Sequence, residues 1–353
     1  LFNLVSLIDA DACTSYENSI DIFIDYVNKN IKQRDDLSTL IGLNNFELVE
    51  NNHKNHTKFM YTIFVTKDIQ SLHDTYIWAY QTYHAKGFDF KYFYLELHAW
   101  KEAFELEDKE SLAPIIELYK YLLSMHDYFV QHATSNVYEL PKTIDDNVYK
   151  NFMDAILKPD LAEALSISKN FIKTNEDINN FWEYIILPAL YEVGAKWANA
   201  EISVGEEHMA TSICQRVMSE HYSKIIKCVK DTKKILVTTS QNELHEVGSR
   251  MLADILELNG HDVTYVSSKS TTKEKLEIIK LEEIEYVIIS VTLVSNIIKT
   301  QELVAQIKTK FKDIIVIVGG QAFSQEGNAN SLPQADYLIQ SKNELLNLLK
   351  KAI

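Results

Sequence analysis

The residues best suited to metal chemistry are Glu243-Leu244-His245-Glu246-Val247-Gly248, which follow a short apolar run. A histidine in such a loop is accessible, and the carboxylate of Glu243 can hold one imidazole nitrogen while the other keeps its lone pair for a metal. Gly248 would let the chain enter a helix without a side chain against the ligand. No second His or Cys lies within ligand spacing, so a single axial ligand to a macrocycle-held metal fits better than a protein cage. A structural loop histidine with an acidic neighbour is the alternative.

The elements that must position this loop alternate between strands and helices. Apolar runs predict strands at 234–239, 262–266, 286–290, 314–318 and 336–339, and helical periodicity predicts helices at 247–258, 272–279, 296–310 and 343–352. This alternation is typical of a doubly wound parallel sheet, in which ligands bind at the carboxyl ends of the strands. Segments 240–248, 290–295 and 319–320 should therefore lie at one rim and contact one ligand.

The preceding residues have helical periodicity throughout. We expect five to seven helices in residues 1 to 133, with breaks near 51–55, 86–87 and 107–110 and a linker at 134–141. Four further helices, at 145–156, 160–174, 176–191 and from about 203 towards 226, predict a bundle. The predicted domains are an all-helical domain (1–135), a four-helix bundle (136–230) and a Rossmann-like domain (231–353).

Composition and charge exclude several classes of protein. The 353 residues carry a net charge of −15, and residues 1–135 alone hold 20 acidic against 11 basic side chains. Without a basic stripe, direct binding to nucleic acid or to an anionic membrane is not expected. No apolar run is long enough to span a bilayer, and no signal peptide is recognisable. The three cysteines form no CxxC pair, which is typical of reduced thiols, so we expect a cytoplasmic protein.

Three pieces of the last segment together resemble the cobalamin (vitamin B12) binding fold. They are Glu243-x-His245-x-x-Gly248, Ser290-Val291-Thr292 and Gly319-Gly320, and they match the family's Asp/Glu-x-His-x-x-Gly, Ser-x-Leu/Thr and Gly-Gly motifs over residues 231–353. The resemblance implies a base-off, His-on cobalamin, with His245 as the lower cobalt ligand and Glu243 orienting it. It also implies that the nucleotide tail runs beside Ser290 and Thr292 and that Gly319 and Gly320 leave room for it.

The helical segment before this fold contains Trp197 and, after nine intervening residues, Glu207-His208. Alone, the pattern is typical of a buried tryptophan at a helix end and a polar pair at a helix start. Next to a cobalamin fold it resembles the cap of the CarH-type B12 photoreceptors, in which the tryptophan covers the upper corrin face and the Glu and His contact the adenosyl group. Two features differ from those receptors. Ala198 cannot supply their second cobalt-ligating histidine, and this chain begins with an acidic helical domain instead of a basic DNA-binding one.

The first domain has 11 aromatic residues between Tyr76 and Phe104. An ordinary aromatic core accounts for them. Alternatively, a globin-like pocket could take a second flat ligand, with His84 or His98 as a contact. That arrangement resembles the photocobilins, which pair B12 with biliverdin, and any bilin would be held without a covalent link. A third interpretation is a surface for partner docking or dimerisation, which the acidity favours.

These observations predict a sensory protein and not an enzyme. We expect it to bind adenosylcobalamin between the bundle and the α/β domain, and to respond when light or loss of the upper ligand frees the Trp197, Glu207 and His208 cap. The response would pass to a protein partner or change a homo-oligomer. The alternative is a corrinoid methyl-carrier subunit of a methyltransferase, an enzyme component with the same cap and fold.

Overall fold

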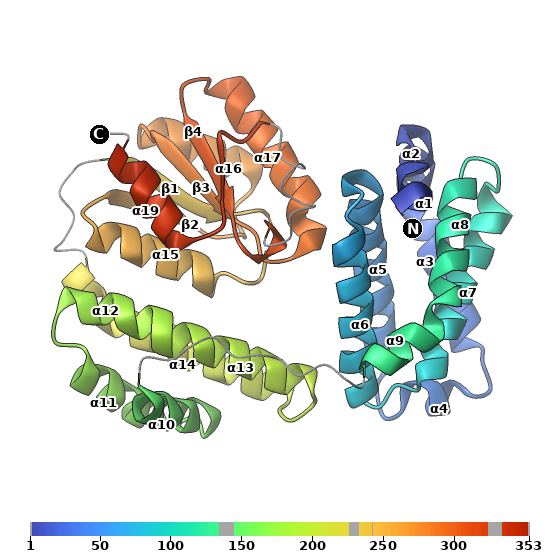
Figure 1. Ribbon diagram of the computed structural model, residues 1–353, viewed down its shortest axis with the longest axis horizontal. Coiled ribbons are helices and arrows are strands. Elements are labelled where there is room, and N and C mark those ends of the chain that lie inside the picture. Colours follow the sequence, from blue (N-terminus) through green and yellow to red (C-terminus); the bar gives the residue numbers. More distant parts are fainter. Residues whose placement is uncertain (1, 134–144, 226–232, 242, 324–333, 352–353) are drawn as a thin grey trace. The chain divides into compact units, whose positions relative to one another are not determined.

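The computed structural model describes residues 2–133, 145–225, 233–241, 243–323 and 334–351 (Figure 1). The chain forms two compact units, one made mainly of residues 1–137 and the other mainly of residues 138–353. The linker predicted at 134–141 and the domain boundary predicted near 230 lie outside the described residues.

The first unit is helical throughout its described part, as predicted. Residues 2–133 form nine helices, more than the expected five to seven because two of them have only five residues: α1 (Phe2–Ser6), α2 (Ala10–Asn18), α3 (Ile20–Lys32), α4 (Leu37–Ile41), α5 (Phe46–Thr66), α6 (Ile69–Ala85), α7 (Phe90–Glu107), α8 (Ala113–Ser124) and α9 (His126–Ala133). The breaks predicted near 86–87 and 107–110 are confirmed. In the described part of the chain, no helix is both long and apolar enough to cross a membrane.

The break predicted at 51–55 is wrong, because α5 runs through it without interruption. Asn and His are poor helix formers, and the prediction rested on that local preference. In the structure His53 is fully buried, and its ring nitrogens lie 2.6 Å from Asn28 Oδ1 and 3.0 Å from the Tyr92 hydroxyl. Tertiary hydrogen bonds and burial therefore override the propensity of this segment.

The second unit begins with the helical cap. It consists of α10 (Asp146–Leu157), α11 (Leu161–Phe171), α12 (Asn175–Phe181), α13 (Leu187–Ala198) and α14 (Val204–Ile225), and a π-helical turn, Trp182–Ile186, joins α12 to α13 without a break. The predicted helix 176–191 is therefore part of a longer one. The π turn ends two residues before Pro188, whose missing N–H removes one hydrogen bond from a regular helix.

The predicted parallel sheet is confirmed. Its strands are β1 (Lys234–Thr239), β2 (Asp262–Val266), β3 (Tyr286–Ser290), β4 (Ile315–Gly319) and β5 (Tyr337–Ile339), all parallel in the order β2-β1-β3-β4-β5. The register aligns Thr239 with Ser290 and Ser290 with Gly319, so the segments that follow β1, β3 and β4 start at the same level.

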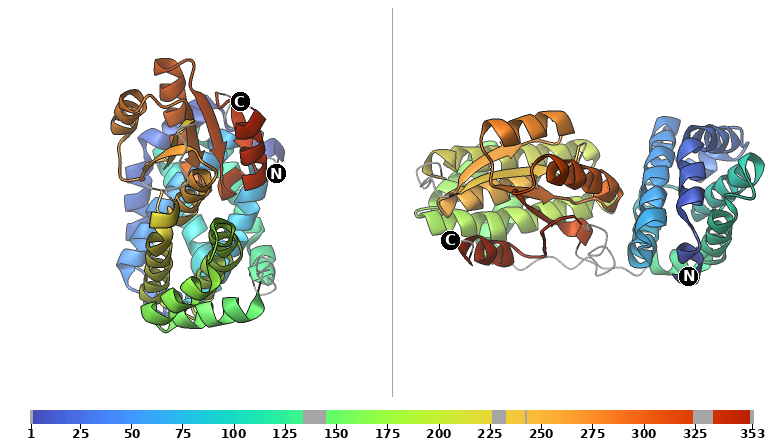
Figure 2. Two further views of the ribbon diagram at one scale, coloured as in Figure 1. Left: turned by 90° about the vertical axis from the view of Figure 1, so that its left-hand side faces the viewer. Right: turned by 90° about the horizontal axis from the view of Figure 1, so that it is seen from above.

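Helices cover both faces of this sheet (Figures 1 and 2). Alternate strand residues pack against α15 (Val247–Leu258) and α19 (Lys342–Lys351) on one face and against α16 (Thr272–Leu281) and α17 (Ile297–Lys310) on the other. In β1, for example, Val237 belongs to the first layer and Leu236 to the second. Burial on both faces explains why the central strands β1, β3 and β4 read as nearly continuous apolar runs.

Candidate functional site

The loop after β1 lies where the order of the strands in the sheet reverses. The chain leaves β1 for β2 on one side, whereas it leaves β3 for β4 on the other, so the ends of β1 and β3 flank the topological switch point. Glu243 stands in this loop and its side chain is fully buried. Its Oε1 accepts hydrogen bonds from the His245 backbone N–H (3.1 Å) and from His245 Nδ1 (2.9 Å).

The other oxygen of Glu243 forms hydrogen bonds to the turn after β3, on the far side of the switch point. Oε2 accepts the backbone N–H groups of Thr292 and Leu293, each at 3.1 Å, and the Asn296 side-chain amide at 2.9 Å. Burial alone would raise the pKa of Glu243, but the hydrogen bonds from His245, Asn296 and Leu293 lower it to about 2. The carboxylate thus stays ionised and fixes the β1 loop to the turn after β3.

Asn296 and Leu293 were not foreseen from the sequence. Leu293 contributes only its backbone N–H, which no sequence pattern marks. Asn296 lies six residues after Ser290, just before α17, and a polar residue at a helix start is usually read as a cap. Its side chain bonds Glu243 instead.

His245 is presented to solvent by this arrangement. Because Nδ1 donates to an ionised carboxylate, it carries the proton, and Nε2 keeps its lone pair. The His245 side chain is 54% exposed, whereas its partner Glu243 is not exposed at all. A single accessible imidazole nitrogen, oriented from behind by a carboxylate, fits the axial position of a metal whose other ligands come from a macrocycle.

The remaining rim residues lie where the sequence placed them. Ser290 ends β3 and is half-buried, and Thr292 contributes its backbone N–H to Glu243. Gly248 is the second residue of α15, and a Cβ built on it would meet nothing within 4 Å. The rim thus brings Glu243, His245 and Thr292 together by hydrogen bonds and leaves open space beside Gly248.

Gly319 and Gly320 lie where backbone segments approach each other closely. A Cβ on Gly319 would lie 2.7 Å from the Ile339 carbonyl oxygen, and one on Gly320, whose φ is +111°, would lie 2.3 Å from the Val291 carbonyl oxygen. Both directions are filled by protein backbone. The glycines therefore allow β4 to approach the end of β5 and the residue after β4 to approach Val291, and their role beside a nucleotide tail stays a prediction.

Replacing Gly248 with alanine should separate stability from ligand binding. Alanine removes the entropic penalty of a helical glycine, so the ligand-free protein should gain about 0.5–1 kcal/mol of unfolding free energy. If the open space belongs to a ligand, the added methyl group should weaken cobalamin binding about 10-fold, because overpacking costs about 1–3 kcal/mol. Urea unfolding and cobalamin titration test both; equal or tighter cobalamin binding would contradict the assignment.

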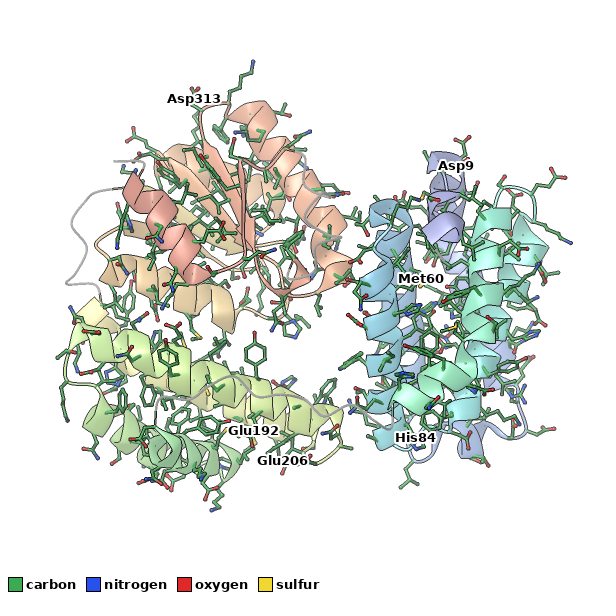
Figure 3. All side chains as sticks on the ribbon, in the orientation of Figure 1. Asp9, Met60, His84, Glu192, Glu206 and Asp313 are labelled. Atoms are coloured by element: carbon green, nitrogen blue, oxygen red, sulfur yellow. The ribbon has the colours of Figure 1, made fainter. Side chains whose placement is uncertain are left out.

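The predicted cap residues gather at the turn between α13 and α14. Half-buried Trp197 is the penultimate residue of α13, and Glu207 and His208 lie in the first two turns of α14. This helix begins with a capping box, in which Ser203 and Glu206 (labelled in Figure 3) exchange hydrogen bonds. The Glu207 carboxylate accepts the Thr211 hydroxyl at 2.9 Å and contacts His208 Nδ1 at 2.5 Å.

Two carboxyl groups of α15 join the cap to the sheet. Asp254 accepts a hydrogen bond from Trp182 Nε1 at 3.0 Å, and Glu257 accepts one from the Tyr222 hydroxyl at 3.2 Å. Trp182 belongs to the π-helical turn and Tyr222 to α14, so both donors come from the cap. Burial raises the pKa of Asp254 to about 7, and the charge of Glu257 adds to this increase.

The Asp254→Asn variant should change the pH dependence of stability. The pKa of Asp254 is about 7 in the folded protein and ordinarily 3.8, so the fold favours the protonated form and loses stability as pH rises from about 4 to 7. The asparagine keeps an acceptor for Trp182 without the charge. Relative to the native protein, it should gain roughly 2–4 kcal/mol between pH 4 and pH 8. Denaturant unfolding at both pH values measures this gain, and a difference independent of pH would contradict it.

The aromatic segment of the first unit forms its core. Most of the 76–104 aromatic side chains are buried, and Tyr80 stacks on Phe93 with ring centroids 4.1 Å apart. His84, at the end of α6 (Figure 3), is 2.9 Å from the Phe88 carbonyl oxygen and stacks on Phe90. His98 pairs with Glu102 at 3.3 Å. The buried rings thus make the contacts of an ordinary aromatic core, whereas His84 is exposed and the His98 side chain is 44% exposed.

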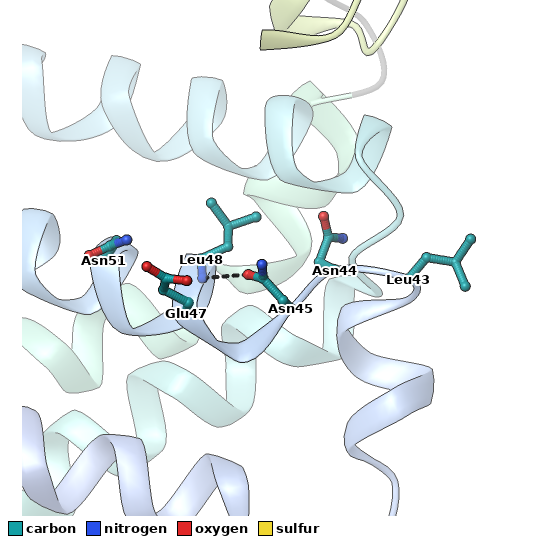
Figure 4. A pocket seen from close by; sticks show the side chains of 6 residues that line it. All are labelled: Leu43, Asn44, Asn45, Glu47, Leu48 and Asn51. Atoms are coloured by element: carbon teal, nitrogen blue, oxygen red, sulfur yellow. Dashed lines mark hydrogen bonds between the residues drawn. The ribbon is translucent and has the colours of Figure 1, made fainter. Parts of the chain in front are cut away.

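A surface hollow of about 460 Å³ opens in the first unit at the start of α5 (Figure 4). Its lining comes from the α4–α5 connection and the first turns of α5: Leu43, Asn44, Asn45, Glu47, Leu48 and Asn51. Asn45 Oδ1 accepts the Leu48 N–H at 2.9 Å and caps the helix. The hollow includes no residue of the aromatic segment, so it is not the flat-ligand pocket considered above.

Comparison with solved structures finds the same fold elsewhere. The monomethylamine corrinoid protein of Methanosarcina barkeri aligns with 59% of this chain and 99% of its own, with 14% identity and a TM-score of 0.50. A novel cobalamin-binding protein from Desulfitobacterium hafniense DCB-2 covers 60% of this chain and 100% of its own (18% identity, TM-score 0.32). The methanol:cobalamin methyltransferase complex of M. barkeri covers 63% and 89% (12% identity, TM-score 0.33). The first of these supports the fold.

Comparison with families gives a more specific result. A family model described as a B12 binding domain matches residues 233–347, and a second model with the same description matches residues 148–220. No curated protein matches the chain. The two matches include the sheet with the His245 loop and nearly all of the cap. Residues 148–220 and 233–347 of this chain are thus each similar to a B12 binding domain.

Proposed function

We propose that this protein is a sensor that binds adenosylcobalamin in the base-off, His-on form. The observation that carries the proposal is the Glu243–His245 pair at the switch point, within a segment that matches a B12 binding domain. His245 would hold the cobalt through Nε2, while Glu243 and Asn296 keep the imidazole oriented. Adenosylcobalamin supplies a cobalt–carbon bond that visible light breaks.

The regulatory part of the proposal rests on the cap. Trp197 would cover the upper corrin face, and Glu207 would exchange its contact with His208 for the hydroxyl groups of the adenosyl ribose. Val204 and Met209, both about half exposed, flank this pair on α14 and offer apolar surface to a flat ligand. Without an upper ligand these residues would lose that contact, and the cap would shift its position relative to the sheet.

The test compares dark and illuminated protein loaded with adenosylcobalamin. We expect green light to change the cobalt absorption bands and to increase hydrogen exchange in α13 and α14. The Trp197→Ala and Glu207→Gln variants should bind cobalamin but show a smaller difference in exchange between dark and light. Unchanged exchange in the native protein after complete photolysis would contradict a sensory role.

A corrinoid methyl carrier is the second candidate function. It is favoured by the similarity of the fold to the monomethylamine corrinoid protein of M. barkeri, which covers almost all of that chain. A carrier must be reduced to Co(I) and accept a methyl group readily, so its cap must open to a methyltransferase. Rapid methylation of the reduced holoprotein, with no exchange response to light, would favour the carrier over the sensor.

The proposal extends to how the signal leaves the protein. Since residues 1–135 are strongly acidic, we propose that the signal passes to a protein partner or a second copy of the chain and not to DNA.

Adding biliverdin to the holoprotein tests the photocobilin variant of the proposal. A stable red absorption band would place biliverdin in the protein, and its absence would leave cobalamin as the sole antenna.

A further inference from the structure

The His245 loop is fastened on both flanks, and only one of the two attachments involves Glu243. On the β3 side, Glu243 bonds the turn at Thr292 and Leu293. On the β2 side, the Glu246 carboxylate accepts the backbone N–H of Ser268, in the turn after β2. His245 thus stands between two carboxylates that are anchored to different neighbouring turns.

The start of the loop is held by a buried lysine. Lys275 of α16 is 1% exposed, and its Nζ donates to the Thr239 carbonyl oxygen, at the end of β1, over 2.7 Å. Burial lowers the pKa of Lys275 to about 8, and the negative charge of Glu246 opposes this shift. A buried ammonium is unfavourable unless it is hydrogen-bonded, and here the Thr239 carbonyl oxygen accepts its hydrogen bond.

The loop's own hydroxyl groups provide no such attachment. Thr239 and Ser240 are fully buried, yet the hydroxyl oxygens of both have no hydrogen-bond partner within the described residues. On the β2 side, the bonds that Lys275 and Glu246 make therefore hold the two ends of the segment 239–246.

We propose that Lys275 and Glu246 are positioning residues for His245, which set the angle at which its imidazole meets the cobalt. This inference rests on the proposed binding of cobalamin through His245. Both residues would act by fixing the backbone of the loop, as partners beyond the direct ligands do in other metal sites. Their loss should leave the cobalamin bound but allow the imidazole to dissociate from cobalt.

The experiment loads the native protein and the variants Lys275→Met, Glu246→Gln and Glu246→Ala with cobalamin and reduces it to Co(II). The proteins are labelled with ¹⁵N-histidine, so electron paramagnetic resonance then gives the fraction of cobalt whose axial nitrogen comes from a histidine, because the cofactor's own base contributes ¹⁴N. We expect a fraction near one for the native protein and below about half for Lys275→Met and Glu246→Ala, with cobalamin affinity reduced about 10-fold. Glu246→Gln keeps an acceptor for Ser268 but loses its charge, so its fraction should lie between those of the native protein and Glu246→Ala.

The matched control is Lys308→Met. Lys308 of α17 also donates to a backbone carbonyl, that of Ile314 at 3.0 Å, but it lies outside the loop's attachments. It should lose stability without losing the axial nitrogen. If all variants keep the nitrogen signal of the native protein, the positioning role is wrong while the proposed function stands. If the native protein itself binds no cobalamin, the proposed function fails first. Should Lys275→Met not fold, the half-buried Glu246 variants still decide the question.

Discussion

Replacing His245 with alanine is expected to weaken cobalamin binding by about 100-fold or more and to change the colour of any cobalamin that remains. Changes to groups behind a metal ligand typically cost 10–100-fold in affinity, so loss of the ligand itself should cost at least as much. The His245 side chain is half exposed and donates through Nδ1 only to Glu243, so the variant should fold. Equilibrium titration with hydroxocobalamin, followed by absorption, measures the effect.

A suitable control removes an imidazole elsewhere. His132 lies on α9 of the first unit, and its Nδ1 is 2.8 Å from the Tyr128 carbonyl oxygen of its own helix. His132→Ala should bind cobalamin as the native protein does. If His245→Ala retains the vitamin with native affinity and spectrum, the assignment of His245 as the cobalt ligand is refuted.

Replacing Glu243 is expected to have the largest effect on stability. In Glu243→Ala, two backbone N–H groups and the Asn296 amide lose their acceptor in a partly buried site. Such unsatisfied donors cost about 1–3 kcal/mol each, so we expect a loss of roughly 3–5 kcal/mol in unfolding free energy. Glu243→Gln keeps one acceptor oxygen and should lose less. In urea unfolding at pH 7, the unfolding free energy should decrease from the native protein to Glu243→Gln and further to Glu243→Ala.

The same carboxylate predicts how stability depends on acid. The pKa of Glu243 is about 2 in the folded protein and ordinarily 4.5, so its contribution is complete above pH 4.5 and is lost as pH falls towards 2. The shift corresponds to about 3 kcal/mol, which the glutamine variant should lack. Glu117→Gln, at an exposed pair with Lys120, is the control and should match the native protein. If Glu243→Gln loses as much unfolding free energy between pH 4.5 and pH 2 as the native protein does, this carboxylate does not cause the loss.

The sequence was most informative where a physical constraint acts on every residue of an element. The central strands β1, β3 and β4 are buried on both faces and therefore almost entirely apolar, and all five strands were located to within about one residue. The position of the candidate site could then be predicted, because the carboxyl ends of parallel strands share one edge of the sheet. The Glu243–His245 contact could be predicted because the two residues are only two positions apart.

What the sequence did not predict depends on contacts between distant residues. The second oxygen of Glu243 bonds residues 49 to 53 positions away, and two of these donors are backbone groups with no sequence signature. The buried His53 held α5 together against its local propensity, and the backbone of Val291 occupies the space beside Gly320. In each case tertiary packing decided the outcome.

The central claim, that His245 binds the cobalt, can be tested by labelling the protein with ¹⁵N-histidine. In the Co(II) form, coordination by a ¹⁴N nucleus splits the resonance lines into triplets, whereas a ¹⁵N nucleus splits them into doublets. Native protein loaded with unlabelled cobalamin should give triplets, and histidine-labelled protein should give doublets. Triplets that persist in the labelled protein would show that the cofactor's own base still occupies the position, and unsplit lines would show that no nitrogen does.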